Sequence, residues 1–235
     1  MTAPFAAIVA VVAQASRRDT LVSWDWVAEH LDDIWSRTVE HVELTLVALA
    51  LGFALSSALA ALAVRHRRTF APITWIGSIL YTIPSVALFG MLIPVTGLGF
   101  WTAEIALVSY TILIFVRNMV AGIDGVPAPV VEAADAMGYT RWQRLRAVEL
   151  PLALPTIVAG LRIAAVTVIG LVTVAAVVGN GGYGAFILDG LDRDFPTPIV
   201  LGAVLSVLLA ATVDAGLALA ERALTPWARR RGGGR

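Results

Sequence analysis

Five stretches of this chain are apolar enough and long enough to cross a lipid bilayer. A helix needs about 20 apolar residues to span roughly 30 Å of hydrocarbon. The five stretches cover residues 42–64, 72–93, 101–121, 157–178 and 198–220. Because a backbone in hydrocarbon must satisfy its hydrogen bonds internally, each stretch is expected to be a helix. The sequence therefore predicts an all-α integral membrane protein with five transmembrane helices.

Composition agrees with this class and excludes several others. Of the 235 residues, 58% are hydrophobic and 14% are charged, and the mean hydropathy is +0.82. The chain has no cysteine, which excludes disulfides, thiolate metal sites and thiol catalysis. Its 17 basic and 17 acidic residues cancel, so the overall charge does not suggest a nucleic-acid partner.

The positions of the arginines predict how the spans are oriented. Short cytoplasmic loops carry an excess of basic residues. Arginines follow the first span at 65–68, the third at 141–146 and the fifth at 228–235, so these three segments are expected to share the cytoplasmic side. The N-terminus is then outside and the C-terminus is cytoplasmic. The acidic segment 24–43 and the loop 179–197 fall on the outer side.

Three regions follow from this arrangement. Residues 1–38 form an N-terminal extracytoplasmic or interfacial segment, residues 39–222 form the transmembrane domain, and residues 223–235 form a basic cytoplasmic tail. In segment 24–38, apolar residues recur at helical spacing between acids, which predicts an amphipathic helix on the outer membrane surface. The apolar run 4–13 is short for a span, and it stays open as a signal-like segment, an interfacial helix or a mis-assigned start.

A hydrophilic segment, residues 132–151, carries six charged side chains within the loop 122–156. It follows a stretch rich in glycine and proline, where the third span is expected to end. Pro129 suits the first position of a new helix and Gly138 suits a left-handed ending, which together predict a helix over 129–137.

The residues after this glycine predict a second short helix. Thr140 and Gln143 have the spacing of a capping box. The helix is expected to run to Leu150 and to stop before Pro151, because proline disrupts a helix interior.

Four side chains determine the charge and the width of the first short helix. Glu132 and Asp135 are expected near its positive end, where the helix dipole favours carboxylates. Ala133 and Ala134 keep it thin. A short, thin, charged helix beyond the membrane is shaped to enter a cleft in another protein.

The spacing in this loop follows a fixed pattern: Glu-Ala-Ala, three residues, glycine, nine residues, an aliphatic residue, one residue, Leu-Pro. It is met by Glu132, Ala133, Ala134, Gly138, Val148, Leu150 and Pro151. The pattern resembles the coupling-loop signature of permease subunits of binding-protein-dependent ABC importers, although valine at 148 stands where isoleucine is commonest. The resemblance implies that Glu132, Ala133, Ala134, Asp135 and Gly138 engage a cytoplasmic ATPase, and that Leu150 and Pro151 set the turn back into the membrane. The alternative is a solvated loop whose charges only keep it out of lipid.

Further stretches between residues 38 and 228 resemble permeases of the osmoprotectant family, which take up glycine betaine, carnitine, choline or proline betaine. They include "TVEHVELTLVAL", "YTIPSVALFGMLIPVTGLG" and "AGLRIAAVTVIGLVTVAAVVGNGGYG". Asn180 and Tyr183 depart from the Ala and Leu frequent in that family.

The family implies the type I ABC importer fold, with five transmembrane helices and a cytoplasmic coupling helix in each permease subunit. It also implies a second permease subunit, identical or homologous, two cytoplasmic ATPase subunits and an extracytoplasmic substrate-binding protein in a bacterial cytoplasmic membrane. ATP and Mg²⁺ are then bound by the ATPase, and this chain is neither an enzyme nor the holder of a cofactor.

Pro84 lies within the second span and removes one backbone hydrogen bond, so it is expected to kink or unwind that helix. Broken helices often line substrate paths. Tyr81, Thr82, Pro84 and Ser85 are therefore candidates for the translocation path, with Tyr81 suited to a cation–π contact with a quaternary ammonium. Structural packing alone remains the alternative.

The segment "GNGGYG", residues 179–184, supplies Asn180 as a further candidate for the path. It lacks the lysine and hydroxyl of a phosphate-binding loop, so nucleotide binding is not expected there. Its glycines permit a tight turn that faces the receptor or forms a gate, and a plain surface loop is equally compatible.

Ionisable residues near the spans are functional candidates by default. Arg162 is expected to reach the interface, Asp214 to pair with a neighbouring helix or a partner subunit, and Glu104 to be accessible to water at the outer end of its span. The three histidines, His30, His41 and His66, lie outside hydrocarbon without companions at ligand spacing, so a metal site is not expected.

Two other functions compete with osmoprotectant import. The first is an ABC permease of the same architecture for another small solute, such as methionine or a different amino acid. The second is a non-ABC channel or structural membrane subunit, which would not associate with an ATPase.

Overall fold

The computed structural model describes residues 21–226, and the regular structure in this range is helical. The apolar run 4–13 and the tail arginines beyond residue 226 lie outside the described residues. The first half of the chain forms α2 (Trp24–Glu29), α3 (Leu31–Arg65), η1 (Arg67–Thr69), α4 (Phe70–Thr82), α5 (Ser85–Thr96) and α6 (Phe100–Asp124). The second half forms α7 (Ala128–Ala136), α8 (Arg141–Arg144), the π-helical turn η2 (Leu145–Glu149), α9 (Leu150–Val174), η3 (Ala175–Val178), α10 (Gly184–Asp192) and α11 (Pro196–Leu224).

The structure contains four or five candidate spans, where five were expected. Four helices in the described range are long and apolar enough to cross a membrane: α3, α6, the helix from Arg141 to Val178 that includes α9, and α11. The fifth is counted when the helical arm of η1 and α4 and the arm of α5, which meet at 99°, are taken as one broken span. The prediction of an all-helical membrane protein is confirmed.

The bend in the second span occurs at the predicted proline. Ile83 and Pro84 both adopt extended backbone angles, with ψ of 127° and 132°, and they separate the end of α4 from the start of α5. Pro84 has no N–H to donate, so the helix ends there rather than curving. The prediction that Pro84 breaks this span is confirmed.

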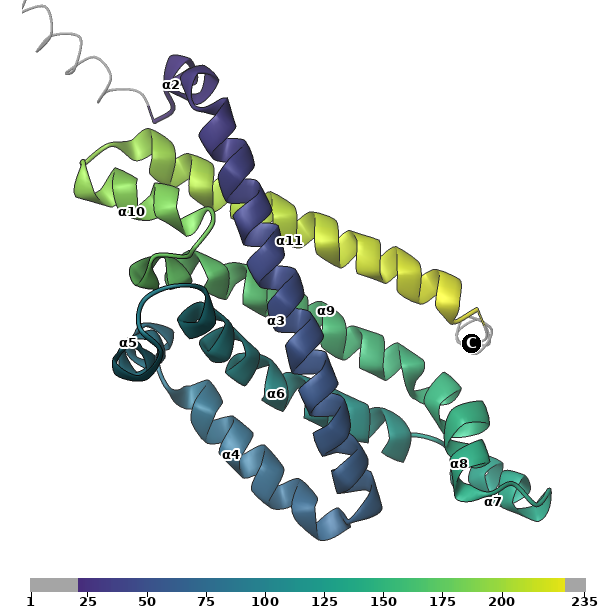
Figure 1. Cartoon of the computed structure of the whole chain (residues 1–235). Helices are drawn as coiled ribbons and strands as arrows, with labels where there is room; N and C mark the ends of the chain where they lie inside the picture. The colour runs from purple at the N-terminus through teal and green to yellow at the C-terminus, as the bar shows by residue number, and fades with distance from the viewer. Residues whose placement is uncertain (1–20, 227–235) are drawn as a thin grey trace, which may run out of the picture.

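Helix α6 lies at the centre of the bundle, with α3, α4 and α9 packed around it (Figure 1). Its side chains Leu107, Phe115 and Val116 are fully buried in the core, which also includes residues of α3 and α9. In contrast, only 11% of the most apolar window of α11 is buried. An apolar helix with so much exposed surface is left for lipid or another subunit to cover.

The expected amphipathic helix over 24–38 is not a separate element. The chain breaks only at His30, and α3 then runs continuously for 35 residues, which is about 52 Å at 1.5 Å per residue. Trp26 stacks on His30 at 4.0 Å and contacts Phe186 and Phe195 edge-on, so α2 packs against the α10 region. The prediction failed because its apolar residues at helical spacing continue directly into the first span.

Candidate functional site

The loop after α6 folds into a hairpin of two short helices, α7 and α8, at one end of the bundle (Figure 1). We call this end the α7 end, and the end that carries α2 and α10 the α2 end. Helix α7 begins after Pro127 and includes Pro129 in its first turn, where the missing N–H costs nothing. The predicted bounds of this helix, 129–137, differ from the observed ones by one residue at each end.

Gly138 ends α7 as predicted. Its φ is 82°, in the left-handed region that favours glycine. The backbone N–H of Gly138 donates to Asp135 O at 3.0 Å, and that of Tyr139 donates to Ala134 O at 3.2 Å. This pair of bonds is a Schellman motif, which satisfies carbonyl groups left free at the helix end. A Cβ at Gly138 would meet nothing within 4 Å, so the backbone angle alone requires the glycine.

The second helix starts with the predicted capping box. The backbone N–H of Gln143 donates to Thr140 Oγ1 at 3.3 Å, and the N–H of Thr140 donates to Gln143 Oε1 at 2.9 Å. Two N–H groups at the start of the helix are thereby satisfied. The turn between α7 and α8 is thus fixed by local hydrogen bonds on both sides.

The predicted end of the second helix at Leu150 and Pro151 is wrong. Helix α8 passes through the π-helical turn η2 into α9, so one helix extends from Arg141 to Val178. Leu150 N–H donates to Leu145 O, five residues back. This wider turn precedes Pro151, whose ring would clash with a carbonyl of an ordinary α-helix. Leu150 and Pro151 therefore lie inside a continuous helix, and they do not form a turn.

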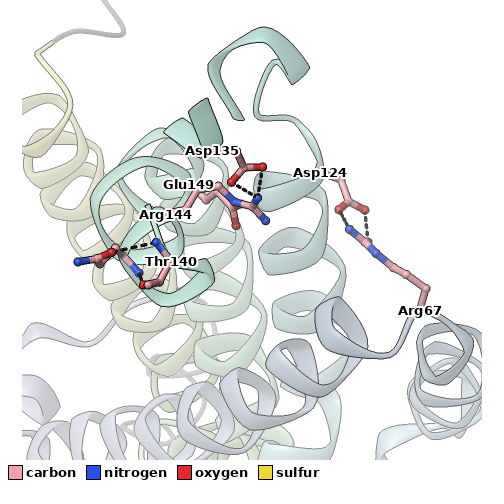
Figure 2. A network of polar contacts seen from close by, with 7 residues as sticks. Arg67, Asp124, Asp135, Thr140, Arg144 and Glu149 are labelled. Atoms are coloured by element: carbon pink, nitrogen blue, oxygen red, sulfur yellow. Dashed lines mark hydrogen bonds and ion pairs between the residues drawn. The ribbon is translucent and has the colours of Figure 1, made fainter. Parts of the chain in front are cut away.

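Arg144 joins the two short helices to the base of α9. Its Nη1 donates to both carboxylate oxygens of Asp135 in α7 at 2.7 Å, and its Nε donates to Glu149 Oε1 at 2.7 Å (Figure 2). Glu149 is buried at 8% exposure. Burial and two ionic partners make this arrangement stiffer than a typical exposed ion pair. The hairpin and the first turn of α9 are therefore linked by one guanidinium group.

Asp135 does not lie where the sequence placed it. It is in the last turn of α7, near the negative end of the helix dipole, where a carboxylate is disfavoured. Arg144 supplies the compensating charge. Glu132, by contrast, is in the middle of α7 and exposed.

A second ion pair ties a neighbouring loop to the same end. Arg67, in η1 after α3, donates from Nη1 to Asp124 Oδ2 at 2.7 Å, and from Nη2 to Asp124 Oδ1 (Figure 2). Asp124 is the last residue of α6. Both groups are about half exposed, so this pair contributes less than a buried one.

The hairpin presents an exposed surface that the bundle leaves open. Glu132, Ala133 and Gly138 are exposed, whereas Ala134 is 1% exposed and packs within the chain. Three large side chains of the hairpin are also exposed: Met137 at 67%, Tyr139 at 39% and Trp142 at 63%. Large apolar side chains that gather on a polar loop are typical of a protein contact surface.

The candidates for the translocation path fall into two separate places. Tyr81, Thr82, Pro84 and Ser85 surround the bend between α4 and α5, and Tyr81 is exposed and meets the ring of Tyr110 at 5.9 Å. The hydroxyl of Tyr110 donates to the free carbonyl of Ile83, which is left unpaired by the broken helix.

Asn180 lies near the α2 end instead. Its Nδ2 donates to Glu40 Oε1 at 3.3 Å, and its Oδ1 lies 3.6 Å from the position of a Cβ at Gly99. The structure therefore groups four of the five path candidates and places the fifth beside α3.

Two ionisable residues, Arg162 and Glu104, differ from the prediction in their contacts and in their exposure to water. Arg162 is not a lone side chain that reaches the interface, because it pairs with Asp214 through Nε at 2.8 Å and Nη2 at 2.9 Å, and with Glu221 at 3.4 Å. The predicted partner of Asp214 on a neighbouring helix is thus found. Glu104 is not reached by water: it is 1% exposed, and neither of its carboxylate oxygens has a hydrogen-bond partner within residues 21–226.

His41 makes contacts with distant segments that its sequence position did not predict. It is fully buried, with Nε2 at 3.1 Å from Ile169 O and Nδ1 at 3.3 Å from the backbone N of Tyr183. These partners lie 128 and 142 residues away along the chain. The only feature of the sequence that could have indicated these contacts is the position of His41 directly before the apolar stretch 42–64. Within residues 21–226, no group of three or more His, Asp or Glu side chains is placed to hold a metal ion.

Comparison with known proteins agrees with this architecture. Residues 46–226 match the model of the family described as binding-protein-dependent transport system inner membrane component. The chain is 38% identical to the choline transport system permease protein OpuBB of Bacillus subtilis, over 81% of this chain and 88% of that protein. It is also 38% identical to the osmoprotectant import permease protein OsmW of Salmonella typhimurium, over 81% of this chain and 91% of that protein.

Two solved structures share the fold. An inward-facing structure of the MetNI methionine ABC transporter has a TM-score of 0.72 at 23% identity, covering 87% of this chain and all of that one. A structure described as an amino acid ABC transporter with histidines has a TM-score of 0.71 at 18% identity, covering 86% of this chain and 98% of that one. The long helices, the broken span and the family match lead to one conclusion: this chain belongs to the inner-membrane permease components of binding-protein-dependent ABC importers, whose ATP hydrolysis is carried out by a separate ATPase subunit.

Proposed function

We propose that this chain is one half of the permease of a bacterial importer for osmoprotectants such as glycine betaine, choline or carnitine. The relatives whose names describe choline and osmoprotectant transport support this substrate class. A further relative, at 36% identity, is the glycine betaine/carnitine/choline transport system permease protein OpuCB of Bacillus subtilis. A second permease subunit, identical or homologous, two ATPase subunits that bind ATP and Mg²⁺, and a substrate-binding protein complete the machine.

The single observation that carries the mechanism is the link through Arg144. The exposed α7 surface with Glu132, Ala133 and Gly138 is the part that we assign to the ATPase contact. Asp135 and Arg144 then transmit displacement of α7 to Glu149 and so to α9. Because Leu150 and Pro151 lie in the same continuous helix, displacement of the hairpin reaches a transmembrane helix without a break in the helix.

The orientation follows from the same assignment. The α7 end faces the cytoplasm, with the C-terminus on that side, and the N-terminus with the α2 end is outside. Residues 1–38, 39–222 and 223–235 are then the outer segment, the transmembrane domain and the cytoplasmic tail, with coupling loop 122–156. The arginines that follow the first, third and fifth spans support this arrangement.

The substrate path is proposed to pass the bend at Pro84. Tyr81, Thr82 and Ser85 flank an interrupted helix, where backbone groups and an aromatic face are available to a passing solute. The ring of Tyr81 suits a quaternary ammonium, since such cations bind aromatic faces. Asn180 is proposed to act at the outer mouth, beside Glu40.

Uptake of radiolabelled choline, glycine betaine and carnitine tests the proposal. The complete transporter, with its own ATPase and binding protein, is expressed in a host that lacks uptake of these solutes. We expect uptake of at least one of them that depends on this chain. Uptake of an amino acid such as methionine, without any of the three, would identify the rival solute class, and absence of any co-purifying ATPase would contradict the ABC assignment itself.

A further inference from the structure

A cavity of about 1080 Å³ opens at the α7 end, between α3, α6 and the helix formed by α8 and α9. It is larger than the roughly 300–1,000 Å³ of most small-molecule sites. No described part of the chain fills it. Since it reaches from the transmembrane helices to the hairpin, its occupant must suit two different environments.

The deep part of the cavity is apolar. Phe53 and Ala60 of α3, Met119 and Ile123 of α6, and Ile157 of α9 line it. These residues belong to helices long enough to span a membrane. Ser57 also lines this part, but its hydroxyl already donates to Phe53 O at 2.7 Å. A hydrocarbon occupant suits this wall, because a polar group would lose its hydration and gain little there.

The rim is charged, and its charge is positive. Arg65, Arg141 and Arg144 face two carboxylates, Asp135 and Glu149, which leaves one net positive charge. Arg144 already holds both carboxylates. Arg65 and Arg141 are exposed, and neither guanidinium has an ion pair or hydrogen bond with any residue in 21–226. Two arginines at the mouth of an apolar cavity thus lack an anion.

Trp142 adds a feature of the membrane interface. Its side chain lines the same cavity, is 63% exposed and carries the guanidinium of Arg146 over its ring at 5.5 Å. Tryptophan prefers the level of the lipid headgroups, where one face is apolar and the other is wet. The Trp142 side chain is therefore suited to lie beside a lipid headgroup at this rim.

We propose that this cavity binds an anionic phospholipid of the surrounding bilayer. One acyl chain lies along the apolar wall between α3 and α6, and the phosphate is held by Arg65 and Arg141. Basic pockets between transmembrane helices are suited to such headgroups. The chain's own tail is a poor occupant because Arg229, Arg230, Arg231 and Arg235 would meet a rim of the same charge.

A bound lipid would connect two parts of the site. Its headgroup touches the last residue of α3 through Arg65 and the first residue of α8 through Arg141. The lipid therefore braces the hairpin against α3, whereas the ion pairs of Arg144 join the hairpin to the start of α9. This role is separate from substrate choice, so it stands whichever solute the importer carries.

Retention of phosphatidylglycerol by the purified transporter, measured by native mass spectrometry, tests the proposal. The complex is prepared with its ATPase in mixed phosphatidylglycerol and phosphatidylcholine. We expect Arg65→Gln to weaken retention by about fivefold and Arg65→Gln with Arg141→Gln by more, since each cation near an anionic surface contributes about that factor. Arg68→Gln is the matched control: Arg68 is an exposed arginine three residues away that does not line the cavity.

Two further variants separate the possible occupants. Ala61→Trp fills the cavity from an exposed position on its wall, and it should displace the lipid while leaving both arginines in place. Arg65→Lys keeps the charge and should keep most of the lipid, which reports on binding even if the double variant fails to assemble. Equal retention in all variants, an equal loss with Arg68→Gln, or loss of subunit assembly without loss of lipid in Ala61→Trp would each overturn the proposal.

Discussion

The long helix from Arg141 to Val178 has one glycine turn before it, at Gly138, and another after it, at Gly182. The two turns are held in opposite ways. At the α7 end, Gly138 is exposed in open space, and the hairpin around it is held by hydrogen bonds and the ion pairs of Arg144. At the α2 end, Gly182 is buried against α3, where a Cβ would lie 2.5 Å from His41 Cβ. One turn is fixed by polar contacts on a surface, and the other by close packing.

The buried turn also has a defined hydrogen-bond pattern. The backbone N–H of Tyr183 can only donate and the carbonyl of Ile169 can only accept. His41 must therefore accept at Nδ1 and donate at Nε2, which is a neutral histidine of one tautomer. The ring of Tyr183 lies against it at 4.5 Å. The α2 end thus joins α3, α9 and the glycine loop into one rigid unit.

This difference indicates which end is available to a partner. A turn that a methyl group would disrupt is part of the fold, whereas a turn in open space with exposed Ala133 and Met137 beside it can be covered by another protein. We therefore expect changes at the α2 end to affect folding, and changes at the α7 end to affect transport in a protein that remains folded.

Gly182→Ala should have the largest effect on stability. The added Cβ meets His41, and the φ of 48° is left-handed, so overpacking and backbone strain together should cost about 2–5 kcal/mol. Thermal unfolding of the purified complex in detergent measures this. The control is Gly138→Ala, which has only the strain of a left-handed alanine, about 1–2 kcal/mol. Equal losses at the two glycines would remove the distinction between the two ends.

Gly138→Val should separate insertion from transport. Valine is stiff and resists the φ of 82°, so α7 would end differently and its exposed surface would turn. We expect normal amounts in the membrane and uptake reduced to about a tenth or less, with ATP hydrolysis no longer coupled, because strain of 1–3 kcal/mol favours another turn. Transport at the normal rate by the purified complex would show that our interpretation of this turn is wrong.

Arg144→Lys should have an intermediate effect. Lysine keeps the charge, but its donors all sit on one nitrogen and cannot span Asp135 and Glu149 as Nη1 and Nε of arginine do, so the link between α7 and α9 loosens. We expect ATP hydrolysis to continue while uptake per ATP falls several-fold, measured in proteoliposomes. Arg146→Lys is the control, since Arg146 contacts Trp142 rather than a carboxylate. The same loss in both variants would mean that the contacts of Arg144 with Asp135 and Glu149 are not what couples the hairpin to α9.

Glu104→Gln should have the smallest effect. Glu104 lies on the buried side of α6, and no described group hydrogen-bonds its carboxylate. Glutamine keeps the shape without a charge, so the melting temperature should be unchanged or slightly higher. A large drop in the melting temperature, with uptake lost, would indicate that Glu104 needs its negative charge for a partner outside the described part of the chain.

Local sequence signals predicted the fold and the turns of the site. Gly138, the Thr140–Gln143 box and Pro84 each act through neighbouring backbone atoms, so their effects are readable from a few adjacent residues. The five spans were equally clear because span length is set by the bilayer.

Contacts between distant segments were not predictable in this way. The burial of His41 depends on residues 128 and 142 positions away, and the pairing of Arg144 with Asp135 depends on how the hairpin closes. Pro151 was misjudged because a π-helical turn accommodates a proline that would end an α-helix. Glu104 was expected to meet water because it lies near the end of its span. That prediction was wrong, since the position along a helix does not say which side of the helix other helices cover.

The contact between α7 and the ATPase is the central claim, and site-directed cross-linking tests it most directly. The chain has no cysteine, so single cysteines can be introduced without background. Ala133→Cys lies on the exposed surface of α7, and Asp192→Cys lies on an exposed position at the α2 end. We predict that Ala133→Cys cross-links to cysteines in the ATPase in the assembled transporter and that Asp192→Cys does not. Labelling of Ala133→Cys by a membrane-impermeant thiol reagent from outside intact cells, with no cross-link to the ATPase, would contradict the account.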